Sequence, residues 1–244
     1  MSTGDSVGKA PLHHYLRISE QLSADLDQGR LQRGERLAPE REMAEHFGCT
    51  RVTLRQALQR LETQGSLYRG PKRGWFVSPL PVRYDPSRTS SFMDYVSAQG
   101  RLPRTECLVA DYRAAGPSLA AKMHLAADEP VFWLQRRRWV DGVPVLLETN
   151  VLRADGCPDL LDQRLDGSLT ALLRDRYDRR LARSEISLKP LLLDEPQSEH
   201  LDIAAGSNGL YLQRLCYDSE GLVVEYDVEH WRADAVEVVM AISG

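Results

Sequence analysis

Two arginines, Arg136 and Arg138, alternate with apolar residues in the segment 131–140, which reads VFWLQRRRWV. In a β-strand, alternate side chains point to the same face, so both arginines share a face with Phe132 and Leu134. Two guanidinium groups beside apolar side chains are costly to bury without a counter-charge. The pattern therefore predicts an anion-binding site. A surface or ion-paired role for the two arginines is the alternative, because Asp and Glu are abundant in the chain.

Ser168 offers a second anion-binding element. It follows Asp166-Gly167 and opens the segment SLTALLRDRY, which has the pattern of a capped helix. The hydroxyl of Ser168 and the first free N–H groups of that helix, near Leu169 and Thr170, can hold an anion. An ordinary helix cap is the other interpretation of such a serine.

Carboxylates are expected at the opposite end of the same site. Glu148 follows Arg138 by ten residues on a returning strand, and Glu225 shares the face of a later strand with Asp227 and Trp231. Such carboxylates could accept hydrogen bonds from sugar hydroxyls or pair with an amine. They could equally hold the two arginines in place when the site is empty.

A second group of chemically capable residues is basic and lies in the segment 50–73. This segment contains one acidic residue, Glu62, against six basic ones: Arg51, Arg55, Arg60, Arg69, Lys72 and Arg73. The net charge of −4 for the whole chain is accordingly the sum of +3 over residues 1–77 and −7 over residues 78–244. A basic N-terminal part is typical of a nucleic-acid-binding unit.

The elements that position these basic residues are three helices and two short strands. Apolar spacing predicts a helix containing Tyr15, Ile18, Leu22 and Leu26, then a helix at EREMAEHF, and a third that begins after Thr50 and ends at Gly65. The last two form a helix-turn-helix, and the strands 66–68 and 75–78 form a wing around the basic turn RGPKRG. Arg51, Thr53 and Arg55 then lie where a recognition helix enters the major groove, and Arg41 lies on the preceding helix.

The run LAPEREMAEHFGCTRVTLRQALQRLETQGSLYRGPKRGWFV resembles the winged helix-turn-helix of GntR-type bacterial transcription regulators. The resemblance covers residues 11–77. It implies operator-DNA contacts by Arg41, Thr50, Arg51, Thr53, Arg55, Lys72 and Arg73, with Gly74 shaping the wing. Two departures from the family pattern are a proline, Pro39, one place later than usual and Lys72 in place of a wing glycine.

The rest of the chain is predicted to form an α+β domain on an antiparallel sheet. Residues 78–91, SPLPVRYDPSRTSS, contain three prolines and read as an extended linker, which sets the domains at 11–77 and 92–244. Strands are expected at 131–140, 143–151, 185–189, 210–217, 222–231 and 236–242, and helices near 118–123, from Ser168 and after Pro196.

The order of these elements is similar to the HutC subfamily of GntR regulators, whose effector domain has a chorismate-lyase-like fold. The resemblance implies effector contacts by Arg136, Arg138, Glu148, Ser168, Thr170, Glu225 and Trp231. The C-terminal ADAVEVVMAI looks closer to the phosphonate-utilisation branch of this subfamily. We therefore expect a homodimeric repressor that is released from its operator by a small phosphonate or phosphate ester, of which 2-aminoethylphosphonate is the favoured type. A sugar phosphate or a carboxylate such as urocanate is the alternative effector.

Composition excludes several other classes. The chain has 244 residues, 42% of them hydrophobic and 27% charged, which suits a folded protein and not a disordered one. No apolar run approaches a membrane span and the first residues are small and polar, so we expect a cytoplasmic protein without a membrane partner. Its four cysteines are far apart and predict neither a metal site nor disulfides, and no cofactor motif is present. A lyase-like enzyme is the competing function, but no nucleophile–base pair supports it.

Overall fold

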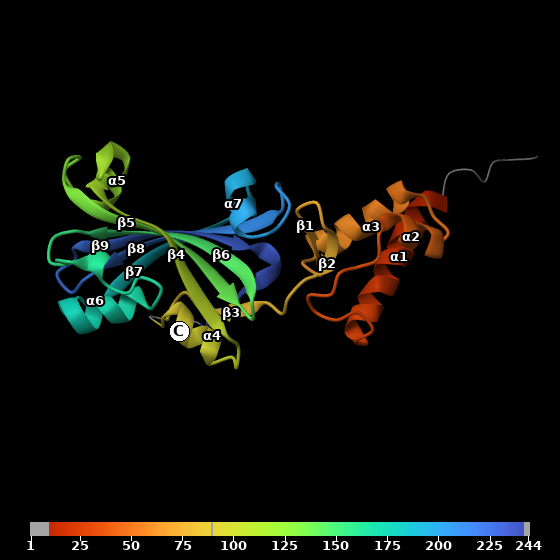
Figure 1. Ribbon diagram of the computed structural model, residues 1–244, viewed down its shortest axis with the longest axis horizontal. Helices are drawn as coiled ribbons and strands as arrows, with labels where there is room; N and C mark the ends of the chain where they lie inside the picture. Colours follow the sequence, from red (N-terminus) through yellow and green to blue (C-terminus); the bar gives the residue numbers. More distant parts are fainter. Residues whose placement is uncertain (1–9, 89, 242–244) are drawn as a thin grey trace, which may run out of the picture.

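The N-terminal part of the chain is a three-helix body with a two-stranded wing. A computed structural model describes residues 10–88 and 90–241. In order, the elements are α1 (Ala10–Asp27), α2 (Glu40–His46), α3 (Arg51–Thr63), β1 (Leu67–Gly70) and β2 (Gly74–Val77). Strands β1 and β2 pair in antiparallel fashion, and the body lies at one end of an elongated molecule (Figure 1). The predicted winged helix-turn-helix is confirmed.

Helix α3 forms because its sequence supplies both a cap and an apolar stripe. The Thr50 side chain accepts a hydrogen bond from the Thr53 backbone N–H at 3.2 Å, which satisfies one free donor of the first turn. Leu54, Leu58 and Leu61 are fully buried against α1, and each such leucine contributes about 2–5 kcal/mol relative to alanine. The opposite side of α3 is thereby left to solvent.

The segment 78–91, predicted as an extended linker, contains a three-residue strand, β3 (Val82–Tyr84). This strand pairs in parallel with β10 (Val236–Val238), outside the main sheet. Pro81 and Pro86 flank the strand and lack N–H groups, which limits the length of the ladder. The strand predicted at 236–242 is accordingly shorter than expected, and its last residue, 242, lies outside the described residues.

The C-terminal part is built on a six-stranded antiparallel sheet with the order β4-β5-β6-β9-β8-β7. Its strands are β4 (Pro103–Ala114), β5 (Pro130–Val140), β6 (Val143–Arg153), β7 (Arg183–Leu192), β8 (Asn208–Tyr217) and β9 (Val223–Arg232). The expected α+β class is confirmed. Strand β4 was not predicted, since its outer half is exposed on both faces and shows no alternation of apolar and polar residues.

Helices cover both faces of this sheet, as Figure 1 shows. One face carries α5 (Gly116–Met123) and α7 (Glu195–His200), and the other carries α4 (Phe92–Ser97) and α6 (Leu169–Tyr177). Short 3-10 turns at Leu160–Asp162 and Ala233–Ala235 complete the chain, and α4 was not predicted. Among the helices of residues 10–88 and 90–241, none is both long and apolar enough to cross a membrane.

The β5–β6 hairpin fixes the register of the candidate site. Asp141 and Gly142 have φ angles of 50° and 79°, the left-handed pair that a two-residue turn of this kind requires. The turn pairs Val140 with Val143, and a β-bulge between Arg138 and Trp139 then shifts the register by one residue. This shift places Arg138 opposite Leu146 and Arg136 directly opposite Glu148. The face of β5 that carries Phe132, Leu134 and both arginines therefore points toward α4 and α6.

Candidate functional site

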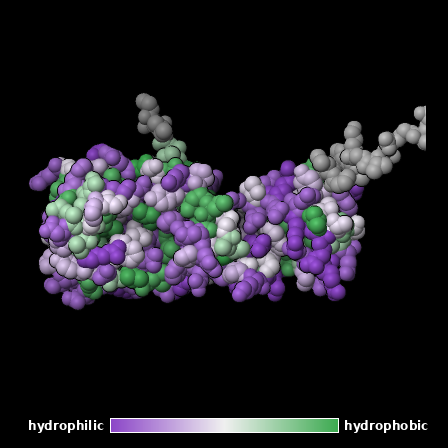
Figure 2. All heavy atoms as spheres, turned by 90° about the horizontal axis from the view of Figure 1, so that it is seen from above, coloured by the Kyte–Doolittle hydropathy of each residue, from purple (hydrophilic) through white to green (hydrophobic). Residues whose placement is uncertain are grey.

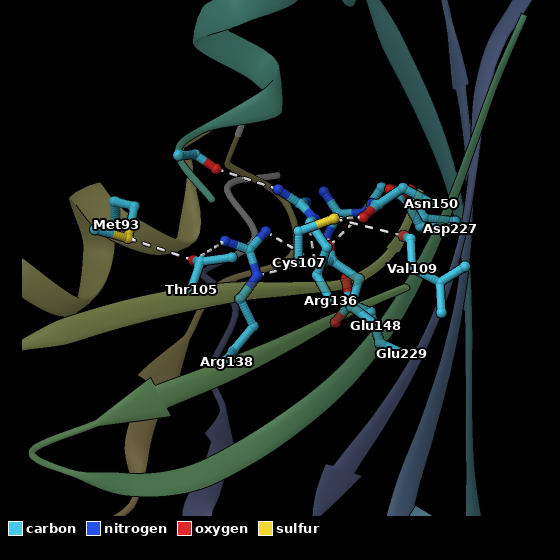
Figure 3. Close-up of polar contacts among 12 residues, drawn as sticks. Met93, Thr105, Cys107, Val109, Arg136, Arg138, Glu148, Asn150, Asp227 and Glu229 are labelled. Atoms are coloured by element: carbon cyan, nitrogen blue, oxygen red, sulfur yellow. Dashed lines mark hydrogen bonds and ion pairs between the residues drawn. The ribbon is translucent and has the colours of Figure 1, made fainter. Parts of the chain in front are cut away.

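The candidate effector site lies on the α4 and α6 face of the sheet, where four neighbouring strands present polar side chains in register. Rows run across β5, β6, β9 and β8 because paired residues of antiparallel strands point to the same face. One row contains Arg136, Glu148 and Glu229, and the next contains Asn150, Asp227 and Arg214. Figure 3 shows most of these side chains converging on one point.

Arg136 and Arg138 are buried and share one carboxylate. Their exposed fractions are 1% and 4%, and both donate to Glu148 Oε2, from Arg136 Nη2 at 2.9 Å and from Arg138 Nε at 2.9 Å. Although burial by itself raises the pKa of Glu148, the two guanidinium groups lower it to about 2. In the described part of the chain, Glu148 is thus the one carboxylate that forms ion pairs with both arginines.

The first turn of α6 faces this arginine pair. Ser168 caps the helix by accepting a hydrogen bond from the Ala171 N–H at 3.1 Å, and the Gly167 carbonyl accepts from Arg136 Nη1 at 3.2 Å. Ser168, Leu169 and Thr170 line the same cavity as both arginines. Guanidinium groups and the positive end of a helix are thereby directed at one small space, an arrangement that favours an anion.

Carboxylates of β9 form the opposite wall. Glu225, Asp227 and Glu229 are 4–6% exposed, and burial raises the pKa of all three, that of Glu229 to about 7. Asp227 accepts from Asn150 Nδ2 at 2.7 Å, whereas the Glu229 carboxylate accepts from Trp231 Nε1 at 2.6 Å. Burial removes water from these carboxylates. A ligand that brings a positive charge or hydrogen-bond donors to this wall would take the place of that water.

Cys216 lies beside two of these carboxylates. Its sulfur and the oxygens of Glu225 and Asp227 are all within 4.8 Å of one another. Burial raises the pKa of the Cys216 thiol, so the group remains protonated at neutral pH. A protonated thiol is a poor metal ligand.

Six of the seven effector residues predicted from the sequence line one cavity of about 70 Å³: Arg136, Arg138, Glu148, Ser168, Thr170 and Glu225. Trp231 is not among the residues that line this cavity; it is fully buried, and its ring stacks on Tyr84 at 5.7 Å between ring centroids. Sequence reasoning did not assign Asn150, Arg214 or Glu229 to the site. Alternation could have found two of them, because Asn150 shares a strand face with Glu148 and Glu229 shares one with Glu225. Tyr84, Ser90, Ser91, Phe92 and Tyr95, from the linker and α4, also line the cavity and gave no such signal.

The N-terminal turn of α3 presents the residues expected to contact DNA. Arg55 Nε donates to Glu40 Oε2 at 2.7 Å, and Arg51 lies 3.9 Å from the same oxygen. Glu40 also accepts from Trp75 Nε1 at 3.2 Å, and these partners lower its pKa against the opposing effect of burial. Glu40 therefore orients both arginines while leaving them more than half exposed. Val52, which the sequence did not single out, is 68% exposed on the same turn.

The other predicted DNA contacts lie on α2 and the wing. Arg41 is exposed 3.9 Å from Glu45, and Lys72 is exposed in the left-handed region at φ 55°. Gly74 has a φ of 89°, which fits its predicted role in shaping the wing. Arg73, by contrast, forms an ion pair with Asp202 of the C-terminal part, and its guanidinium lies over the Phe76 ring.

A winged helix-turn-helix joined to a sheet domain with a cavity lined by buried arginines and carboxylates defines a class, that of ligand-responsive DNA-binding regulators. Comparison with known families places the chain more narrowly. The model of the gntR family of bacterial regulatory proteins matches residues 14–77, and the UTRA domain model matches residues 98–237. The chain therefore belongs to the GntR family of bacterial transcription regulators and carries a UTRA domain.

Individual relatives agree with this assignment. The chain is 26% identical to the uncharacterized HTH-type transcriptional regulator YihL of Escherichia coli (strain K12), over 91% of this chain and 94% of YihL. It is also 26% identical to the transcriptional repressor NagR of Bacillus subtilis (strain 168), over 93% of each chain. The crystal structure of PhnF from Mycobacterium smegmatis matches with a TM-score of 0.66 and 27% identity, over 93% of this chain and 99% of PhnF. The protein is thus a transcription regulator, not an enzyme.

Proposed function

We propose that this regulator is a homodimeric repressor that leaves its operator when a small anionic effector binds the UTRA domain. One observation carries the proposal: Arg136 and Arg138 lie buried against the first turn of α6, sharing a single carboxylate. A phosphonate or phosphate group would give the two guanidinium groups a second anionic partner beside Glu148. NagR is a transcriptional repressor, which supports the direction of the response.

The carboxylates of β9 define the other end of the effector. Glu225 and Asp227 can accept hydrogen bonds from an amine or from hydroxyl groups, which favours a zwitterion such as 2-aminoethylphosphonate or a phosphorylated sugar. Another relative, 23% identical, is described as a probable repressor of a fructoselysine utilization operon. A carboxylate such as urocanate remains a third candidate, with one anionic group in place of the phosphonate.

A thermal-shift screen with matched variants tests the effector proposal. Aminoalkylphosphonates, sugar phosphates and imidazole acids are compared on the wild type, on Arg138→Gln and on Arg137→Gln. Arg137 is the control because it lies on the opposite face of β5, paired with Glu106 at 2.7 Å. We expect Arg138→Gln to weaken binding about 10- to 100-fold, since it removes a charge-assisted contact. A ligand that binds all three proteins equally would refute the assignment.

We propose that the domain spanning residues 11–77 reads DNA through the N-terminal turn of α3. Arg51, Thr53 and Arg55 would contact base edges and phosphates in the major groove, with Thr50 and Arg41 nearby and Lys72, Arg73 and Gly74 at the wing. Two such domains on a pseudo-palindromic operator would raise the affinity through linkage. The linker 78–91 would carry the response from the domain of residues 92–244 to the spacing of the two recognition helices.

Replacement of one arginine tests the DNA contact. We expect Arg51→Ala to abolish binding to an operator selected from random duplexes by the wild type, while effector binding stays intact. Arg60→Ala, near the last turn of the same helix, serves as the control and should keep most of the affinity. A mobility-shift assay that gives Arg51→Ala normal operator affinity would contradict the assignment.

A further inference from the structure

The sheet of the C-terminal part has one edge without the features that normally prevent pairing with another chain. Its edge strands are β4 and β7, the first and last in the strand order. Strand β7 contains Lys189 and Pro190, two residue types that block pairing at an edge. Strand β4 has neither type between residues 109 and 114, and its β-bulge, between Cys107 and Val109, comes before this stretch. All residues of the stretch 109–114 are exposed, and in the described part of the chain no strand pairs with their free side.

The backbone groups that face away from the sheet in this stretch belong to Ala110, Tyr112 and Ala114. Just beyond β4, the Ala115 N–H donates to the Glu129 carbonyl at 2.9 Å, and these two residues continue the register in which β4 pairs with β5. In an antiparallel ladder, successive residues of a strand direct their N–H and C=O groups alternately to its two sides. The odd-numbered residues of the stretch therefore bond to β5, whereas the even-numbered ones offer free N–H and C=O groups to a further strand.

The charges of the stretch 109–114 select one way for it to pair with its own copy. In antiparallel self-pairing, residues at equal distances on either side of a two-fold axis lie opposite one another. With the axis at Tyr112, Asp111 lies opposite the partner's Arg113 and the converse pair also forms, which gives two ion pairs. An axis at Asp111 or at Arg113 places that charge opposite itself, which is destabilising. An axis at Ala110 or at Ala114 leaves both charges opposite uncharged residues.

The side chains on both faces of the stretch suit the register with the axis at Tyr112. Asp111 and Arg113 are about half exposed, 3.9 Å apart, on the face that α5 covers, where the Arg113 guanidinium lies 4.4 Å from the centre of the Trp133 ring. Tyr112 is 55% exposed on the opposite face, with its ring 5.3 Å from that of Phe132. Self-pairing brings the two Tyr112 rings side by side, and the neighbouring residues on that face are alanines, which leave room for them.

We propose that residues 109–114 pair in antiparallel fashion with the same residues of a second copy, with the two-fold axis at Tyr112, and that this pairing holds the homodimer together. It joins two six-stranded sheets into one continuous sheet. Because Lys189 and Pro190 protect the β7 edge, the assembly stops at two copies. The inference rests on the homodimer of the proposed function, and it adds the surface, the register and the two ion pairs.

Charge reversal in the full-length chain tests the register. Asp111→Arg and Arg113→Asp each place like charges opposite one another, twice in the dimer because of the two-fold axis. We expect each variant to weaken dimerisation at least about tenfold. The double variant, Asp111→Arg with Arg113→Asp, should regain most of the lost affinity, since the two ion pairs form again with their charges exchanged. Sedimentation velocity over a range of concentrations measures the dimer Kd. Glu220→Arg, in the β8–β9 turn, makes the same charge change as Asp111→Arg away from β4 and should dimerise as the wild type does.

Disulfide trapping tests the position of the axis. Tyr112→Cys places a thiol opposite its own copy, at a Cα–Cα distance of about 5.5 Å that a disulfide can span. Ala110→Cys is the matched control, because its two copies lie four residues apart along the strands, about 13 Å, which is beyond the reach of a disulfide. We expect mild oxidation to cross-link Tyr112→Cys and not Ala110→Cys, with the wild type and its four native cysteines as the baseline.

The outcomes separate this inference from the proposal on which it rests. If the wild type dimerises but neither charge reversal weakens the dimer, the β4 pairing is refuted while the homodimer stands. The same holds if the double variant is as weak as the single ones, or if Tyr112→Cys cross-links no better than Ala110→Cys. If the wild type is a monomer at every concentration, the homodimer itself fails and the inference fails with it. Circular dichroism of each variant should match that of the wild type, because every substituted side chain is exposed.

Discussion

At the scale of single residues, the proposed effector site depends on Glu148. Its carboxylate accepts from Arg136, Arg138 and Asn150, and it is 7% exposed. This buried carboxylate balances the charge of two guanidinium groups, and the protein without ligand needs it to stay stable. An incoming anion competes with Glu148 for the same guanidinium donors. Stability without ligand and affinity for the ligand are therefore opposed at this residue.

Replacing Glu148 by glutamine should move these two properties in opposite directions. Glu148→Gln leaves two buried guanidinium groups without their counter-charge, and breaking such a pair costs about 3–5 kcal/mol. Inorganic phosphate should restore more stability to the variant than to the wild type, because it then supplies the missing charge. Thermal unfolding with and without phosphate measures both effects. An unchanged melting temperature together with an unchanged phosphate response would refute this account.

The raised pKa of Glu229 predicts a pH dependence. An ordinary glutamate has a pKa of 4.5, whereas Glu229 has one of about 7, so the folded protein binds more protons than the unfolded chain between these values. Stability must then fall as the pH rises from about 4.5 to about 7. Asp227 and Glu225 act in the same direction, whereas the stability contributed by Glu148 is lost only as the pH falls toward 2.

Glu229→Gln should reduce this loss of stability. The amide oxygen can still accept from Trp231 Nε1, but the side chain no longer ionises. We expect the drop in melting temperature between pH 5 and pH 8 to shrink by roughly 2–4 °C, which corresponds to about 1 kcal/mol for a chain of this size. Calorimetry at the two pH values measures it. Equal drops in variant and wild type would show that Glu229 titrates normally.

At the scale of elements, a helix cap and the proposed ligand site coincide at Ser168. Loss of a serine cap costs about 1 kcal/mol wherever it occurs. Asp194 caps α7 in the same way, accepting from the Gln197 N–H at 2.9 Å, but it does not line the effector cavity. The two caps therefore provide a comparison in which the structural cost is similar and the proposed ligand contact is present in one only.

Ser168→Ala and Asp194→Ala should lose similar stability but differ in ligand response. Both variants should melt a few degrees lower than the wild type, because each leaves a first-turn N–H unsatisfied. Only Ser168→Ala should also lose affinity for inorganic phosphate, by about tenfold, as expected when a donor to an anion is removed. Equal phosphate affinity in the two variants would show that Ser168 is only a cap.

Elements were predictable from the sequence where their patterns are local. The cap at Thr50, the Asp141-Gly142 turn and the alternation along β5 predicted α3 and the β5–β6 hairpin closely. The pairing of Arg136 with Glu148 was not predicted, because it depends on the β-bulge between Arg138 and Trp139. Strand β4 was not predicted because it is exposed over much of its length, and helix α4 was not predicted because it has only six residues. The place of Tyr84 at the cavity could not be predicted either, since it depends on the pairing of β3 with β10 across more than 150 residues of sequence.

At the scale of the whole molecule, the net charge of −4 is the sum of a basic N-terminal part and an acidic C-terminal part, and these two parts are in contact. Figure 2 shows hydrophilic surface over much of both parts. The wing docks on the loop after α7, where the Ala204 N–H donates to the Arg69 carbonyl at 2.7 Å and Arg73 pairs with Asp202. The guanidinium of Arg232 also lies 4.1 Å from the centre of the Tyr68 ring. An arginine predicted to contact DNA is thus engaged by the effector domain.

Asp202→Asn should free this arginine and strengthen DNA binding. Asparagine tolerates the left-handed φ of 56° at this position, so the substitution removes charge with little strain. Because Arg73 and Asp202 are both about half exposed, their pair contributes only about 0–1 kcal/mol, and the gain in affinity should be at most about fivefold. Fluorescence anisotropy on non-operator duplex DNA measures this electrostatic contribution without knowledge of the operator. The gain should disappear as salt is raised, since exposed charges are then screened. A gain that persists at high salt would indicate instead that the whole wing had detached from the effector domain.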